Sequence, residues 1–98
     1  MKVYCIIHHY GHIADPRYYE NDYANERDLV TVCDTKELAE EYIVENGMKL
    51  GGAYIGRRPD WLSKDRSRFG YEVEVGPNER EWDYYAIQEQ DLVTRLES

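Results

Sequence analysis

The strongest structural signal in the chain is a single helix over residues 34–47, set between runs in which apolar and polar residues alternate. Asp34 suits the N-cap, and Glu37, three residues later, completes a capping-box pattern. The apolar stripe that follows consists of Leu38, Ala39, Tyr42 and Ile43. Gly47 suits the left-handed position after the last helical turn. One amphipathic helix among strand-like runs predicts an α+β domain.

Four runs are rich in β-forming residues, and we expect strands at residues 2–9, 27–33, 69–75 and 82–88. We expect long loops at 11–26 and 48–68, a turn at Gly76-Pro77-Asn78, and a short terminal helix at 89–97. The predicted fold is therefore α+β: a small, mostly antiparallel four-stranded sheet with one main helix packed on a face. Its order along the chain is strand-strand-helix-loop-strand-strand.

The first predicted strand is apolar on both of its faces. Val3, Cys5, Ile7 and His9 alternate with Tyr4, Ile6, His8 and Tyr10. This pattern favours a central strand that is covered on at least part of both sides. In the third strand, Tyr71, Val73 and Val75 are expected to point inward, with Glu72 and Glu74 outward.

The length of 98 residues fits one domain, residues 1–98, with one core. No apolar run approaches the roughly 20 residues that a membrane-spanning helix needs. The chain begins without the pattern of a signal peptide, and Cys5 and Cys33 do not make a disulfide framework. We therefore expect a cytoplasmic protein that contacts no membrane and carries two buried thiols.

Charge is distributed unevenly along this acidic chain, whose net charge is −8. The predicted helix, the first long loop and the C-terminal hairpin are acidic. Residues 49–68 instead carry six basic against two acidic residues. This polarity also allows self-association, in which the basic segment of one copy meets an acidic face of another. A homodimer is therefore one expectation.

Acidic side chains on a rigid face can imitate a nucleic-acid backbone and occupy a basic channel of another protein, although a solvated face is the commoner use of such a surface. Our first hypothesis is a non-enzymatic protein-binding inhibitor with no cofactor. The residues that we expect to contact its partner are Arg57, Arg58, Trp61, Arg66, Arg68, Glu40, Glu41 and Glu45.

Residues 2–46 carry a resemblance that bears on this hypothesis. The run Val3-Tyr4 through His8-His9-Tyr10, and later Asp34-Thr35-Lys36-Glu37-x-Ala39-Glu40-x-Tyr42-Ile43, resemble the opening of small uncharacterised bacterial and phage proteins. In size, acidity and tyrosine content the chain is similar to phage-encoded anti-defence proteins, including anti-CRISPRs. The resemblance implies a partner in host defence, one that binds nucleic acid, and it assigns no residues.

Two alternatives remain open at this stage. His8, His9 and His12 could serve a small enzyme or ligand-binding domain, because histidine titrates near neutrality. Together with the two cysteines they show zinc-like spacings, but neighbouring strand residues point to opposite faces, so we expect no metal. The basic segment 49–68, with its interleaved aromatic residues, could instead bind nucleic acid directly. The competing explanation is that its arginines pair with the protein's own carboxylates.

Overall fold

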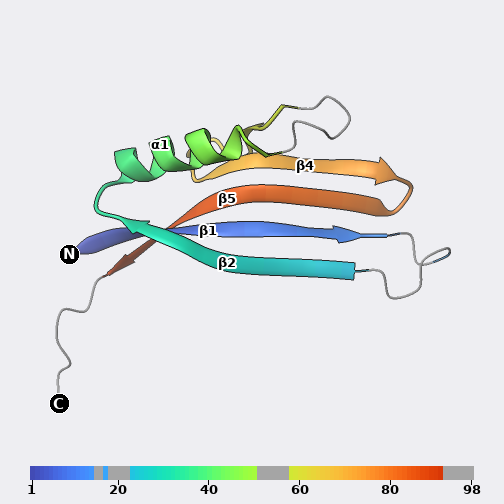
Figure 1. Ribbon diagram of the computed structural model, residues 1–98, viewed down its shortest axis with the longest axis horizontal. Coiled ribbons are helices and arrows are strands. Elements are labelled where there is room, and N and C mark those ends of the chain that lie inside the picture. Colours follow the sequence, from blue (N-terminus) through green and yellow to red (C-terminus); the bar gives the residue numbers. More distant parts are fainter. Residues whose placement is uncertain (15–16, 18–22, 51–57, 92–98) are drawn as a thin grey trace, which may run out of the picture.

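A computed structural model describes residues 1–14, 17, 23–50 and 58–91. Its elements are β1 (Lys2–Ile13), β2 (Tyr23–Cys33), α1 (Lys36–Gly47), β3 (Asp60–Trp61), β4 (Arg68–Gly76) and β5 (Glu79–Asp91). The strands form one sheet in the order β2-β1-β5-β4-β3, and each neighbouring pair is antiparallel. In Figure 1, β2 lies along the edge of the sheet farthest from β4, and α1 lies beside β4.

The α+β class, the antiparallel sheet and the single main helix are confirmed for the described residues, whereas the strand count was wrong. The sheet has five strands because β3 pairs Asp60 with Gly70 and Trp61 with Phe69. A two-residue strand is too short to produce an alternating pattern, so the sequence predicts only a loop there.

The other predicted boundaries also shift, because pairing extends the strands beyond their apolar runs. β1 continues to Ile13 and β2 begins at Tyr23, so both ends of the predicted loop 11–26 are strand. β5 spans thirteen residues and includes Glu89–Asp91, where a terminal helix was predicted. The remainder of that predicted helix, 92–98, lies outside the described residues.

The core lies between α1 and one face of the sheet. Ile6, Ala39 and Ile43 are fully buried, and Phe69 is 5% exposed. Tyr4, Tyr85 and Ile87 pack around them from the same face of the sheet. We call this side the helix face.

The opposite side, the open face, carries Val3, Cys5, Ile7 and His9 on β1, and no described helix covers it. The expectation that β1 is covered on both sides is therefore wrong for the described part of the chain.

The ends of α1 differ from the predicted capping box. Thr35 is the N-cap, and its hydroxyl Oγ1 accepts a hydrogen bond from the backbone N–H of Leu38 at 3.2 Å. This shifts the helix start by one residue, so Asp34 lies outside it and Glu37 is one residue too early for the box. Leu38 itself is 52% exposed rather than part of the buried stripe.

Gly47 is the last residue of α1 and has no left-handed backbone. It is buried because α1 approaches Phe69 closely at this point. A Cβ atom built on Gly47 would lie 2.4 Å from Phe69 Cδ1, which is closer than any real contact. The glycine therefore serves helix–sheet packing and not helix termination.

The hairpin that joins β4 to β5 turns at Pro77-Asn78, and Asn78 takes a positive φ of 60°. The predicted turn is confirmed, although β5 begins at Glu79 and not at Trp82. Tyr71 is 8% exposed, as expected, but Val75 is 36% exposed. A register shift between Glu74 and Gly76 breaks the alternation there and turns Val75 outward.

Candidate functional site: an acidic groove beside α1

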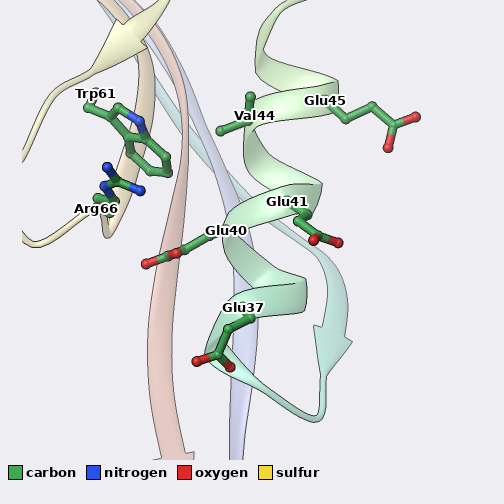
Figure 2. Close-up of a pocket in the computed structure, with 7 residues that line it drawn as sticks. All are labelled: Glu37, Glu40, Glu41, Val44, Glu45, Trp61 and Arg66. Atoms are coloured by element: carbon green, nitrogen blue, oxygen red, sulfur yellow. The ribbon is translucent and has the colours of Figure 1, made fainter.

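A groove of about 500 Å³ lies between α1 and the segment that contains β3. Figure 2 shows the side chains that line it, with glutamates on the helix and an indole with a guanidinium across from them. Its lining residues are Glu37, Glu40, Glu41, Val44, Glu45, Trp61 and Arg66. The groove therefore has glutamates of α1 along one wall and an aromatic side chain in the other.

The helical repeat decides which glutamates share a side of α1. Residues three or four apart on an α-helix lie on the same side, so Glu37 lies between Glu40 on one side and Glu41 with Glu45 on the other. Ala39 and Ile43 lie buried against the sheet, which fixes the rotation of α1 about its axis. In Figure 2, Glu40 and Val44 point toward Trp61 and Arg66, whereas Glu41 and Glu45 point to the far side of the helix. Glu40 is thus the carboxylate most directly inside the groove.

Trp61 forms the wall opposite α1. Its ring meets the Phe69 ring edge-on, with centroids 5.1 Å apart and an interplanar angle of 80°, so the core supports it from behind. On its other side, the guanidinium carbon of Arg66 lies 5.5 Å from the ring centroid. This is cation–π geometry, which holds a cation over an aromatic face.

The loop that carries Arg66 is braced by hydrogen bonds. The Asp65 carboxylate accepts from the hydroxyl and the backbone N–H of Ser67, at 2.7 and 3.1 Å. The Ser63 hydroxyl oxygen accepts from the backbone N–H groups of Ser67 and Arg68, at 3.1 and 3.2 Å. Arg66 itself has a φ of 59°, which is uncommon for a residue other than glycine. The braced turn therefore sets where the guanidinium lies.

Those hydrogen bonds also set the acidity of Asp65. The Ser67 hydroxyl, then Ser63, then the Ser67 backbone N–H stabilise its ionised form and lower its pKa from 3.8 to about 2. The ammonium of Lys36, at the start of α1, donates to the backbone carbonyl oxygen of Asp65 at 3.3 Å. This bond joins the braced turn directly to the helix that carries the glutamates.

Five of the eight residues predicted to contact a partner lie together in this groove: Glu40, Glu41, Glu45, Trp61 and Arg66. Arg68 alternates with the buried Phe69 and so lies on the open face. Arg58 is exposed and is not among the lining residues, and Arg57 lies outside the described residues. Sequence reasoning missed Glu37 and Val44 as lining residues, although both share the helical spacing of Glu40 and Glu41.

The three predicted histidines do not form one site. His8 lies on the helix face, where its Nε2 is 2.5 Å from Asp83 Oδ1 and its ring contacts the rings of Tyr10 and Tyr85. His9 lies on the open face and stacks on Tyr84, with centroids 4.9 Å apart. The described residues contain no group of three or more His, Cys, Asp or Glu side chains that could hold a metal ion.

The surroundings of His9 favour its neutral form. Burial lowers its pKa first, and the positive charges of Arg27, of His8 when protonated, and of Arg68 lower it further. On the helix face, the Tyr10 hydroxyl donates to Asp28 Oδ2 at 3.1 Å, which raises the pKa of that phenol. The two faces of β1 thus differ in their electrostatics.

The basic segment 49–68 is not one continuous surface in its described part. Arg66 lies over Trp61 beside the groove, while Arg68 lies on the open face. Residues 51–57 of this segment lie outside the described residues. Arg66 and Arg68 therefore do not lie along one track for a nucleic-acid strand.

No protein-family model, curated protein or solved structure matches the chain. Within the described ranges, no helix has the length and apolar character that a membrane crossing requires. The geometry of the groove is therefore the main basis for a functional proposal.

Proposed function

We propose that the chain is a non-enzymatic protein-binding inhibitor whose acidic groove beside α1 engages a basic surface of a protein partner. The observation that carries this proposal is the groove itself, which has a volume of about 500 Å³. In it, Glu40 and Val44 on one wall point toward Trp61 on the other. An arginine or lysine side chain has a cationic head and an apolar stem, and this pair of walls offers a partner to each.

The charge around the groove extends the same surface. The register of β1 with its neighbours places Glu26, Asp28, Glu81 and Asp83 on the helix face, the side that also carries α1. Acidic side chains over one side of a small rigid domain create a negative potential that steers a basic partner toward it. The acidic surface is thus wider than the groove, which would supply its specific contact.

Trp61 and Arg66 suit the role of anchors in such an interface. Tryptophan and arginine are enriched among the residues that contribute most of the binding energy between proteins. Both are held in place before binding, Trp61 by Phe69 and Arg66 by the braced turn, so little side-chain entropy is lost when a partner docks.

The proposed partner class is a nucleic-acid-binding protein of host defence. A surface that binds a phosphate backbone is rich in arginine and lysine, which is the chemistry that the glutamates of α1 complement. The resemblance to phage anti-defence proteins favours this class. On this proposal the chain inhibits its partner by occupying the surface that nucleic acid would occupy.

The test uses nonaarginine as a basic probe, with a Trp82→Phe background that leaves Trp61 as the only tryptophan. We expect probe binding to change Trp61 fluorescence, and Glu40→Gln to weaken binding up to about fivefold, the upper end of the range for one exposed charge pair. Glu74→Gln is the matched control, because Glu74 is an exposed acid on the open face. It should leave binding nearly unchanged.

Two results would overturn the proposal. One is equal weakening by Glu40→Gln and Glu74→Gln, which would mean that only the net charge matters. The other is probe binding with no change in Trp61 fluorescence, which would place the contact outside the groove. A competition assay extends the test: the chain should displace a double-stranded oligonucleotide from nonaarginine.

A further inference from the structure

The open face of the sheet is apolar across β2, β1 and β5. Pairing sets Leu29 beside Ile7 and Val32 beside Cys5, and Ala86 continues the surface on the other side of Ile7. Leu29 is 65% exposed and Val32 49%. A continuous apolar surface of this kind is uncommon on a monomeric soluble protein. Where it occurs, it marks an interaction site.

One row of residues crosses the open face from edge to edge, with opposite charges at its two ends. Arg27 on β2 pairs with His9, His9 with Tyr84, Tyr84 with Gly70, and Gly70 with Asp60 on β3. Because directly paired residues point to the same side of a sheet, all five belong to the open face. The row therefore begins with a cation and ends with an anion.

We propose that the open face is the interface with a second copy of this chain, with the two sheets packed face to face. A two-fold axis parallel to the strands reverses the row in the second copy, so that Arg27 of each copy lies over Asp60 of the other. The same rotation sets His9 of each copy over Gly70 of the other. Sheets that pack in this aligned way are common, with a mean angle of about 30° between their strands.

The available area is sufficient for a dimer. Four long strands at about 4.8 Å spacing, each about ten residues long with a rise of about 3.3 Å, present roughly 600 Å² before side-chain relief is added. About three quarters of this area lies on β2, β1 and β5, and the rest on β4, whose open-face residues include Arg68 and Glu74. The total is close to the ~800 Å² that each partner buries in a standard interface. The glutamates of α1 and the carboxylates of the helix face lie on the other side, so stacking keeps the two strongly acidic surfaces apart.

This dimer is a different interface from the one expected from sequence, in which a basic segment meets an acidic face. It is also independent of the proposed function, because the groove lies on the helix face and stays accessible in both copies. A groove variant such as Glu40→Gln should therefore remain dimeric.

The test is the mass of the full chain in solution, measured by light scattering during size-exclusion chromatography. At about 100 μM, where a dimer of micromolar affinity is mostly assembled, we expect twice the chain mass of 11.7 kDa. Leu29→Glu should give the monomer. Leu38→Glu is its matched control, since Leu38 is a leucine of similar exposure on α1, and it should remain a dimer.

A charge exchange tests the arrangement of the row. Arg27→Asp should shift the equilibrium toward monomer, because it sets two acids against each other at both ends of the row. Adding Asp60→Arg should restore the dimer. If the double variant is as monomeric as the single one while the wild type is dimeric, the proposed two-fold arrangement is wrong.

A wild-type monomer at 100 μM would overturn the proposal outright. A chain truncated after Asp91 then distinguishes the remaining occupants of the open face. Dimerisation only after truncation would assign the face to residues 92–98 of the same chain, and a truncated monomer would assign it to a different protein.

Discussion

The guanidinium carbon of Arg66 lies 5.5 Å from the centroid of the Trp61 ring. Both residues line the wall of the acidic groove that stands opposite α1. They belong to a stretch with no regular period, yet each is held by contacts with its neighbours. Phe69 supports the indole, and the hydrogen bonds of Asp65 with Ser67 hold the turn that carries the guanidinium. A stretch that the sequence predicts as loop thus builds one wall of the candidate site.

Replacing Gly47 with alanine tests the close approach of α1 to the sheet. Helix propensity alone predicts that alanine stabilises a helix by about 1 kcal/mol relative to glycine. The new Cβ would meet the Phe69 ring, so we expect Gly47→Ala to lower the free energy of unfolding by about 1–3 kcal/mol, as overpacking usually does. Urea denaturation measures the change.

Gly76→Ala is the control for that substitution. A Cβ on Gly76 would lie 3.1 Å from Glu79 Oε2, the far end of a flexible side chain that can move aside. We expect a clearly smaller loss of stability. Stabilisation by Gly47→Ala would mean that α1 does not pack on Phe69 as described.

The hydrogen bond between His8 and Asp83 should contribute more to stability than the one between Tyr10 and Asp28. Both side chains of the first pair are 24% exposed, whereas the second pair lies at the surface. Double-mutant cycles with alanine should give a coupling energy of about 1–2 kcal/mol for His8–Asp83 and less for Tyr10–Asp28. Equal couplings would contradict the burial of the first pair.

Asp65 provides a pH-dependent test of the braced turn. Its pKa is about 2 in the folded chain, below its ordinary value of 3.8, because hydrogen bonds stabilise the carboxylate. A depressed pKa means that this group stabilises the fold above about pH 4 and that the contribution is lost as the pH falls toward 2. The stability difference between wild type and Asp65→Asn should therefore shrink over that interval.

NMR titration of the Asp65 carboxyl measures the cause directly. Ser67→Ala should raise the pKa toward 3.8, because the Ser67 hydroxyl makes the largest contribution to the shift. Lys36→Met should change the pKa little, since the charge of Lys36 contributes least. An unchanged pKa in Ser67→Ala would show that the turn is held in another way.

Local patterns predicted the features that depend on nearby residues. The helix was predicted because Ala39 and Ile43 recur at helical spacing, and the hairpin because Pro77-Asn78 separates two alternating runs. Features that depend on distant residues were not predictable in this way. The role of Gly47 depends on Phe69, and β3 exists only because β4 offers a free edge to Trp61.

The same distinction applies to the candidate site. Charge and residue type predict Glu40, Trp61 and Arg66 as partner contacts, but nothing in the sequence joins them into one groove. Conversely, His8 and His9 are neighbours in the sequence, and strand alternation sends them to opposite faces. The net charge of a segment predicts the charged surfaces only in part. The register of the sheet places neighbouring charged residues of one strand on opposite faces.

The most direct test of the acidic groove is the salt dependence of nonaarginine binding, compared between wild type and Glu40→Gln. Raising ionic strength from 0.1 to 1 M shortens the screening length from about 10 Å to about 3 Å. We expect wild-type affinity to fall steeply over this range and its advantage over Glu40→Gln to disappear at high salt. Affinity that stays flat with salt, or a Glu40→Gln variant indistinguishable from wild type at low salt, would contradict it.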